Sequence, residues 1–131
     1  MKEISICRRF KFDAAHKLPK YKGKCNNLHG HSFHIDVSIS GLIQDKGESE
    51  NGMIMDFGRL KEIVNKNILN LTDHKYLNES LPLEDPTAEN MAELFFDDLT
   101  STLKSEEPTI KLKFIRVWET EDAYAECREA K

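Results

Sequence analysis

Polar and apolar residues alternate strictly in two stretches near the start of the chain, which predicts two β-strands. Over residues 4–12 the even positions are apolar except for Arg8, and over residues 31–43 the odd positions carry the apolar side chains. Successive side chains of a strand point to opposite faces, so each stretch has one apolar face. We expect strands at about residues 2–13 and 31–43.

Two later segments have the spacing of amphipathic helices. Asp56 can cap the first helix and Thr87 the second, because both side chains accept hydrogen bonds from free N–H groups of a first turn. The apolar positions recur every three or four residues, as one buried helix face requires. They are Leu60, Ile63, Val64, Ile68 and Leu71 in the first helix, and Ala88, Met91, Ala92, Phe95 and Leu99 in the second.

The C-terminal region predicts two more strands. Ile110, Leu112 and Phe114 alternate, and the apolar phase then passes to Ile115 and Val117, which indicates a β-bulge. A last short strand is expected at about residues 123–128. The order ββααββ predicts an α+β fold, in which an antiparallel four-stranded sheet carries two helices on one face. The edges of such a sheet need protection, and association between copies is one solution.

Length and composition predict one soluble domain. The chain has 131 residues, enough for a core of its own, and neither repeats nor a linker divide residues 1–131. A net charge of −4 gives no electrostatic case for nucleic acid. Because there is neither a signal peptide nor a long apolar run, we expect a cytoplasmic protein without membrane contact. Three cysteines, an odd number, argue against a disulfide framework.

Three histidines and one cysteine are the candidate chemistry. Continued alternation places His16 and His31 on the apolar faces of the first two strands, with His29 and Cys25 close by, whereas His34 falls on the polar face. A lone histidine is usually a surface residue, but three on adjacent strands favour a metal site. Catalytic zinc has three protein ligands and one open position. Zinc is favoured over copper or iron because neither methionine nor carboxylate is evident beside the imidazoles, although ligand type alone does not fix the metal.

Six motifs spread over nearly the whole chain resemble those of the 6-pyruvoyltetrahydropterin synthase / 6-carboxytetrahydropterin synthase family. They are Phe12-Asp-Ala-Ala-His16, Cys25-x3-His29-Gly-His31, Gly52-Met-Ile-Met-Asp-Phe57, Leu71-Thr-Asp-His-Lys-Tyr-Leu-Asn78, Asp85-Pro-Thr-Ala-Glu-Asn90 and Val117-Trp-Glu-Thr120. The resemblance implies the tunnelling fold, in which trimers close a barrel and two trimers stack into a hexamer. It also implies a zinc-dependent lyase acting on 7,8-dihydroneopterin triphosphate.

The resemblance assigns a role to each candidate residue. The zinc ligands are matched by His16, His29 and His31, the catalytic thiol by Cys25, the Asp–His pair that completes the triad by Asp73 and His74, and the acid that anchors the pterin by Glu119. Each role is physically reasonable. A thiolate beside positive charge is a good base, and a carboxylate orients a catalytic imidazole. An ionised Glu119 can accept two hydrogen bonds from the N–H edge of a pterin.

Without the resemblance, some of these residues have simpler readings. Asp73 would be a turn residue, His74 a surface histidine and Glu119 a solvated strand residue. Thr87 and Glu89 are explained as a helix start. Four lysines, Lys17, Lys20, Lys22 and Lys24, crowd the segment before Cys25. Charge runs usually form a solvated loop, but this one adjoins the proposed metal, so at least one lysine is a candidate for binding triphosphate.

The spacing within the second motif favours one branch of the family. The three residues between Cys25 and His29 resemble the bacterial 6-carboxytetrahydropterin synthase of queuosine biosynthesis. This branch converts the substrate to 6-carboxy-5,6,7,8-tetrahydropterin, acetaldehyde and triphosphate.

Three alternatives stay open. A 6-pyruvoyltetrahydropterin synthase of the biopterin pathway would eliminate triphosphate and release no acetaldehyde. A non-catalytic zinc or pterin-binding module would have no need of Cys25, Asp73 and His74 together. A zinc hydrolase would need a carboxylate base such as His-Glu-x-x-His supplies, and the chain has no such motif.

Overall fold

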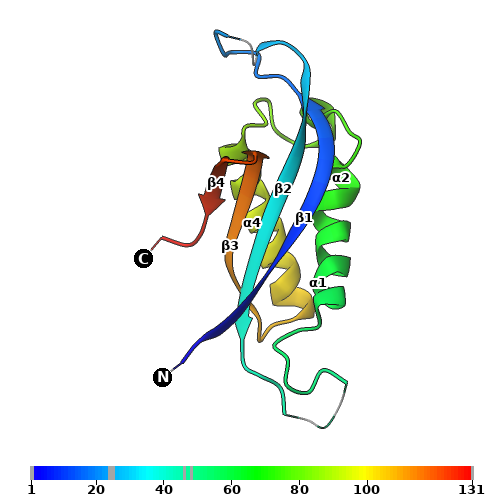
Figure 1. The fold of residues 1–131 in the computed structure, drawn as a ribbon, viewed down its shortest axis with the longest axis vertical. Helices are drawn as coiled ribbons and strands as arrows, with labels where there is room; N and C mark the ends of the chain where they lie inside the picture. Colours follow the sequence, from blue (N-terminus) through cyan, green and yellow to red (C-terminus); the bar gives the residue numbers. More distant parts are fainter. Residues whose placement is uncertain (1, 24–25, 46, 48, 131) are drawn as a thin grey trace.

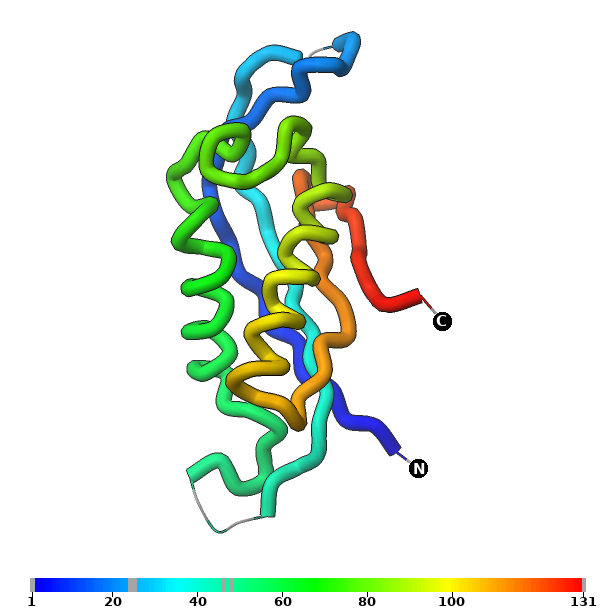
Figure 2. Tube along the Cα trace, turned by 180° about the vertical axis from the view of Figure 1, so that it is seen from behind, coloured from blue at the N-terminus to red at the C-terminus, as the bar shows by residue number. Residues whose placement is uncertain are grey.

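The computed structural model describes residues 2–23, 26–45, 47 and 49–130, and it contains the predicted antiparallel sheet. The strands are β1 (Ile4–His16), β2 (His29–Gly41), β3 (Lys111–Thr120) and β4 (Ala123–Cys127), and they lie side by side in the order of the sequence (Figure 1). All the helices lie on one face of the sheet, as the view from behind shows (Figure 2). The α+β prediction is therefore confirmed.

Both N-terminal strands are displaced toward the histidines relative to the prediction, since β1 covers Ile4–His16 and not residues 2–13, and β2 covers His29–Gly41 and not residues 31–43. We expected β1 to end near residue 13 and β2 to begin near residue 31. In the structure the antiparallel ladder continues until His16 pairs with His29. The phase of each strand therefore holds through the histidines, which share a face with Phe12 and Phe33.

The first predicted helix is interrupted by a π-helical turn. It consists of α1 (Phe57–Val64), η2 (Asn65–Leu69) and α2 (Asn70–Thr72), and Asp56 caps it by accepting a hydrogen bond of 2.6 Å from the Gly58 N–H. A π turn adds one residue to the helical repeat, so the face of the helix shifts by one position. Leu71, which was expected on the buried face, is 44 % exposed, whereas Thr72 is fully buried. The Leu71 assignment is wrong for this reason.

The second predicted helix forms as expected after a short helix that the sequence did not predict. This short helix is α3 (Leu77–Ser80), and α4 (Ala88–Glu106) follows. The Thr87 hydroxyl caps α4 by accepting a hydrogen bond of 3.0 Å from the Asn90 N–H. The buried face of α4 covers the sheet and forms the core with α1, η2 and the inner strand residues. Its buried residues are Met91, Ala92, Phe95, Phe96, Leu99 and Leu103.

Two irregularities interrupt the pairing of β3. Ser38 pairs with Phe114 and Ile39 with Leu112, so Lys113 is the extra residue of the predicted bulge. The second shift lies between Trp118, which pairs with Tyr124, and Thr120. Bulges redirect side chains locally, and this second one occurs at Glu119.

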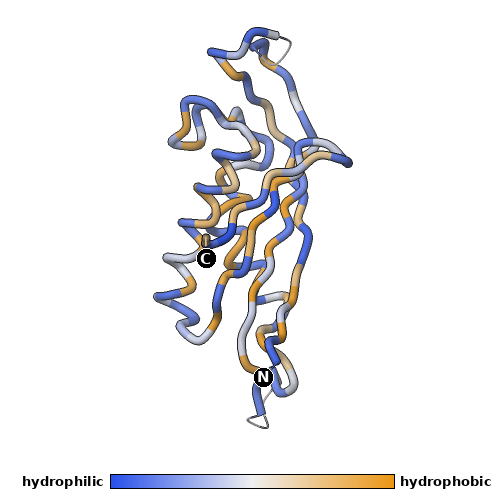
Figure 3. Tube along the Cα trace, turned by 90° about the vertical axis from the view of Figure 1, so that its left-hand side faces the viewer, coloured by the Kyte–Doolittle hydropathy of each residue, from blue (hydrophilic) through white to orange (hydrophobic). Residues whose placement is uncertain are grey.

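The sheet face without helices is polar, and the central strand β2 carries buried polar residues on it. Asp36 is only 6 % exposed, because its carboxylate accepts two hydrogen bonds from Arg9 and one of 2.8 Å from the Trp118 indole. The Arg9 guanidinium also lies 5.0 Å from the centre of the Trp118 ring. The hydropathy pattern in Figure 3 shows the mixture of polar and apolar residues along these strands. Among the helices of the described residues, none has the length and apolar character needed to cross a membrane.

Candidate metal centre and neighbouring groups

Three imidazole rings meet where β1 ends and β2 begins. The ring centres of His16, His29 and His31 are 4.6 to 5.2 Å apart. The ladder brings these rings together, because His16 pairs with His29 and His31 lies two residues further along the same face of β2. His34 lies on the opposite face of β2, between Lys11 and Trp118 in the neighbouring strands.

Two of the histidines use Nδ1 for a hydrogen bond to a backbone carbonyl, which leaves Nε2 free to face the cluster. The Nδ1–H of His16 can donate to the Pro86 carbonyl at 2.9 Å, and that of His29 to the Asn27 carbonyl at 2.7 Å. These bonds select the tautomer with an unprotonated Nε2. The Nε2 atoms of all three histidines are buried and have no hydrogen-bond partner among the described residues. Three such nitrogens facing one point fit a metal ion.

Glu119 completes this cluster from β3. Its Oε1 lies 3.3 Å from Nε2 of His16 and 3.5 Å from Nε2 of His31, although neither contact has hydrogen-bond geometry. One ligand atom from each of the four side chains lies within 4.8 Å of the others, so the cluster could hold a metal ion. The sequence argument for zinc assumed that no carboxylate lies beside the imidazoles. That assumption is wrong. The sequence contained one indication of the carboxylate: Glu119 has the same strand parity as the buried Ile115 and Val117, which places it on the same face of β3.

The local environment favours the protonation states that bind a metal. Burial lowers the pKa of His31, with a further contribution from the other two imidazoles, while the charge of Glu119 opposes the shift. Neutral imidazole is the form that coordinates cations.

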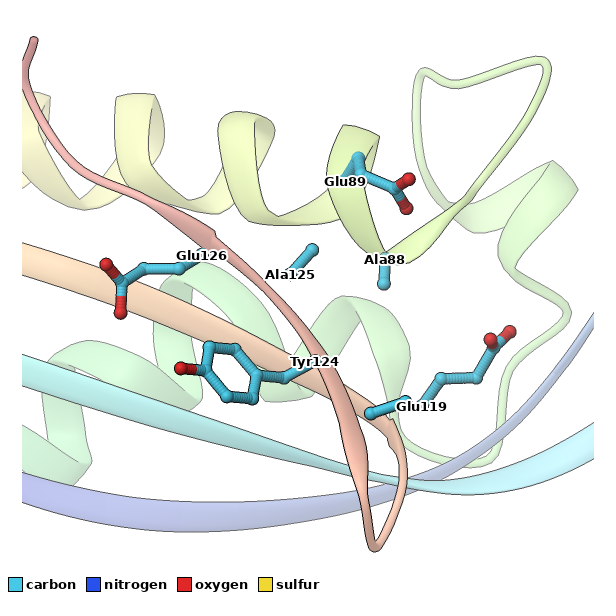
Figure 4. A pocket seen from close by; sticks show the side chains of 7 residues that line it. Ala88, Glu89, Glu119, Tyr124, Ala125 and Glu126 are labelled. Carbon is cyan, nitrogen blue, oxygen red and sulfur yellow. The ribbon is translucent and has the colours of Figure 1, made fainter.

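A cavity of about 390 Å³ opens beside Glu119 (Figure 4). It lies between the first turn of α4 and the β3–β4 hairpin, and the Glu89 and Glu119 carboxylates both line it. The other lining residues are Ala88, Ala123, Tyr124, Ala125 and Glu126. Glu119 therefore belongs both to the imidazole cluster and to a cavity that can admit a small molecule with N–H donors.

Asp73 and His74 form a second group, together with Asp13, at the outer edge of β1. Asp73 Oδ1 accepts a hydrogen bond of 3.0 Å from the Asp13 N–H and lies 3.1 Å from His74 Nδ1. The Asp13 N–H is the main cause that lowers the pKa of Asp73, and His74 adds to it. The backbone is held as well, since the His74 N–H donates to the Asp13 carbonyl at 2.7 Å; His74 has a φ of 60°.

The two groups point away from each other within one chain. Asp13 alternates with the buried Phe12 and Ala14, so its side chain faces the side of the sheet without helices, whereas His16 faces the helices. The described residues therefore do not bring Asp73 and His74 to the imidazole cluster.

The remaining candidates lie in the connection between β1 and β2, which extends beyond the sheet (Figure 1). Cys25 and Lys24 lie outside the described residues. Lys17, Lys20 and Lys22 belong to this connection and all three are exposed; the Lys20 Nζ lies 3.5 Å from a carboxylate oxygen of Glu84.

Comparisons with known proteins agree with this arrangement. The family model described as 6-pyruvoyl tetrahydropterin synthase matches residues 5–130. A 6-carboxy-5,6,7,8-tetrahydropterin synthase of Synechocystis is 46% identical over 94 residues, which cover 72% of this chain and 73% of that protein. The protein of the same name from Haemophilus influenzae is 33% identical over 146 residues, covering 96% and 99%.

A solved structure shows the same fold. The 6-pyruvoyl tetrahydropterin synthase of Caenorhabditis elegans superposes with a TM-score of 0.80 at 26% identity, covering 99% of this chain and 98% of that one. The chain belongs to the 6-pyruvoyl tetrahydropterin synthase family.

Proposed function

We propose that this chain is a zinc-dependent 6-carboxy-5,6,7,8-tetrahydropterin synthase. It converts 7,8-dihydroneopterin triphosphate and water to 6-carboxytetrahydropterin, acetaldehyde and triphosphate. The observation that carries the proposal is the convergence of three imidazole nitrogens that have no hydrogen-bond partner among the described residues, in a chain that matches the family model almost from end to end. The identity to relatives with this name and the three-residue spacing after Cys25 support the carboxy branch.

His16, His29 and His31 would hold the metal. When bound, zinc supplies Lewis acidity, which polarises oxygens of the substrate side chain and makes the neighbouring C–H more acidic. Three neutral imidazoles suit zinc, and they leave one position for the substrate. Glu119 lies close enough to contribute to this group, but we assign its carboxylate to the pterin ring in the adjoining cavity.

Proton transfer belongs to Cys25, Asp73 and His74. Cys25 takes protons from the substrate side chain as a thiolate base. Asp73 binds the Nδ1 side of His74, which leaves Nε2 to relay a proton during the internal redox step. The substrate is oxidised and reduced within itself, so neither nicotinamide nor flavin is required. At least one lysine of the β1–β2 connection binds the triphosphate.

We further propose that residues 1–131 act as one domain in a cytoplasmic homo-hexamer, built as a dimer of trimers. Asp73 and His74 of one chain would then meet Cys25 of another. The exposure of His74, whose side chain is 79% accessible, and its place at the outer edge of β1 support a site shared between chains.

Product analysis tests the reaction. The purified protein is incubated with zinc and 7,8-dihydroneopterin triphosphate, and the products are identified by mass spectrometry. We expect 6-carboxytetrahydropterin together with acetaldehyde. A pyruvoyl product without acetaldehyde would place the chain with the activity named for the Caenorhabditis elegans structure. Absence of any product, with the pterin still bound, would identify a binding module.

A further inference from the structure

The Asn78 side chain makes three hydrogen bonds to the backbone of two other segments. It lies in α3 and is partly buried. Its Oδ1 accepts a hydrogen bond of 3.0 Å from the Lys17 N–H, and its Nδ2 donates to the Lys17 carbonyl at 2.8 Å. The same Nδ2 donates to the Glu84 carbonyl at 3.2 Å. One amide thus joins the residue after β1 to the connection before α4.

The two hydrogen bonds to Lys17 satisfy the backbone groups that a neighbouring strand would otherwise bind. Lys17 follows His16, the last residue of β1, and an amide that binds both its N–H and its C=O imitates one hydrogen-bonded pair of an antiparallel ladder. Backbone polar groups beyond a strand end need such partners to keep one conformation. Asn78 therefore fixes the direction in which the chain leaves His16.

The third bond reaches the segment that holds the His16 ring. Glu84 lies two residues before Pro86, whose carbonyl accepts the hydrogen bond from His16 Nδ1. The backbone directly after His16 is therefore held at Lys17, and the His16 ring is held at Pro86. Asn78 binds Lys17 itself and Glu84, two residues before Pro86. Glu84 also forms an ion pair with Lys20, so the segment bound by Asn78 contacts the lysines of residues 17–23.

We propose that Asn78 is a positioning residue, which sets the geometry of His16 as a metal ligand and fixes the start of the lysine-bearing segment at residues 17–23. The metal part of this inference rests on the proposed function. An amide that merely stabilised α3 would leave the ligand geometry unchanged, and this difference can be measured.

The first test compares Asn78→Ala and Asn78→Asp with the control Asn67→Ala. Asn67 also donates to a backbone carbonyl, that of Ile63 at 2.8 Å, and accepts a hydrogen bond from Thr102, but it lies in η2. Each protein is loaded with Co²⁺, its visible spectrum is recorded, and transfer of the ion to a chelator is timed. Loss of an outer partner of a metal ligand typically weakens metal binding by about 10–100-fold.

We expect altered Co²⁺ bands and transfer faster by about tenfold or more in both Asn78 variants. Asn67→Ala should lower the unfolding midpoint and keep the wild-type spectrum and rate. Asn78→Asp retains the acceptor for the Lys17 N–H, so it provides a folded variant even where alanine destabilises the chain. Wild-type spectra and transfer rates in both Asn78 variants would overturn the metal part of the proposal.

The second test needs no metal. Trypsin is added to the metal-free proteins, and cleavage after Lys20 and Lys22 is followed by mass spectrometry. Loss of the hydrogen bonds from Asn78 should speed cleavage in the Asn78 variants, because proteases cleave backbone that unfolds locally. Unchanged cleavage would contradict the positioning role of Asn78, whereas failure of the wild-type protein to take up Co²⁺ would contradict the proposed metal centre instead.

Discussion

The histidine cluster owes its chemistry to what binds each ring on its far side. Carbonyl groups of Pro86 and Asn27 occupy Nδ1 of His16 and His29, so each ring presents a lone pair at Nε2. His16 is completely buried, where an unsatisfied ring nitrogen is unfavourable unless a cation uses it. The cluster is thus preorganised for a metal by backbone groups as well as by its ligands.

Removal of one imidazole should therefore remove the metal. We expect His29→Ala to lower bound zinc from one ion per chain to a small fraction and to abolish turnover. His34→Ala is the matched control, since His34 lies on the other face of the same strand, and it should keep both. Zinc content by atomic spectroscopy measures the difference. Full occupancy in His29→Ala would contradict the ligand assignment.

Removal of the thiol should separate catalysis from metal binding. In Cys25→Ala we expect wild-type zinc content and pterin affinity, with turnover reduced about 10²–10⁴-fold, the usual contribution of a general base. Cys7→Ala should change turnover little, because Cys7 lies far along β1 from the histidines. Loss of zinc from Cys25→Ala would show that the thiol is a ligand.

At the scale of the elements, the π turn decides which residues of the first helix reach the core. Hydrophobic periodicity predicted Leu71, because the rule assumes 3.6 residues in every turn. The wider turn over Asn65–Leu69 keeps Ile68 fully buried, exposes Leu71 and buries Thr72, whose hydroxyl donates to the Ile68 carbonyl at 2.9 Å. No simple sequence signal marks this insertion.

Two substitutions test the shifted face. Ile68→Ala should lower the free energy of unfolding by about 2–5 kcal/mol, because it leaves a cavity under a fully buried side chain. Leu71→Ala should change it by only about 0.5 kcal/mol, as exposed substitutions usually do. Urea denaturation gives both values. Equal losses would indicate that both side chains are buried and that the helix is regular.

The buried Asp36 on the polar face of the sheet should make stability depend on pH. Burial is the largest influence and raises the pKa of Asp36, but hydrogen bonds from Arg9 and Trp118, with the nearby positive charges, outweigh it and leave the pKa below its ordinary value. A carboxylate with a depressed pKa stabilises the fold above its unfolded pKa of about 3.9, and this contribution is lost as the pH falls through the folded pKa.

We expect Asp36→Asn to be less stable than wild type by roughly 1–2 kcal/mol at pH 7. The difference should shrink below about pH 4 as wild-type Asp36 becomes protonated. Urea unfolding at several pH values measures it, and Asp45→Asn serves as a control at an exposed aspartate. A difference that stays constant down to pH 3 would show that the ionised form contributes nothing.

Alternation predicted the sheet and the faces of its histidines, because backbone geometry fixes a period of two along every strand. The strand ends were harder to predict, because His16 and His29 are polar and do not continue the apolar pattern. They belong to the strands because they pair with each other across the ladder. The position of Glu119 beside the imidazoles depends on strand order and on a second bulge, which are long-range features. Asn78 ends one of the family-like motifs, but hydrophobic periodicity does not predict its hydrogen bonds to Lys17, because they join residues about sixty positions apart.

At the scale of the whole molecule, the structure divides the proposed catalytic groups between two faces of one sheet. The histidines and Glu119 face the helices, whereas Asp73 and His74 lie with Asp13 toward the open face, at the outer edge of β1. Residues 73–76 cover only the upper end of this edge, where Tyr76 bridges to Ala15. Among the described residues, no further strand pairs with the rest of β1 or with the outer edge of β4, so neighbouring chains can pair there. A complete triad is therefore expected only in the assembled protein.

Complementation between two inactive variants tests the shared site. Cys25→Ala and His74→Ala chains should each be inactive alone. After they are mixed and reassembled, some interfaces pair an intact thiol with an intact imidazole, so part of the activity should return. If one chain supplied the whole triad, every site would keep a lesion and no activity would return. Subunit exchange is verified by mass spectrometry of differently tagged chains.

Mixing Cys25→Ala with an Asp73→Asn chain should also restore activity, because Asp73 and His74 come from the same chain, whereas mixing Asp73→Asn with His74→Ala should not. Proven exchange without rescue in the first mixture would rule out the shared site.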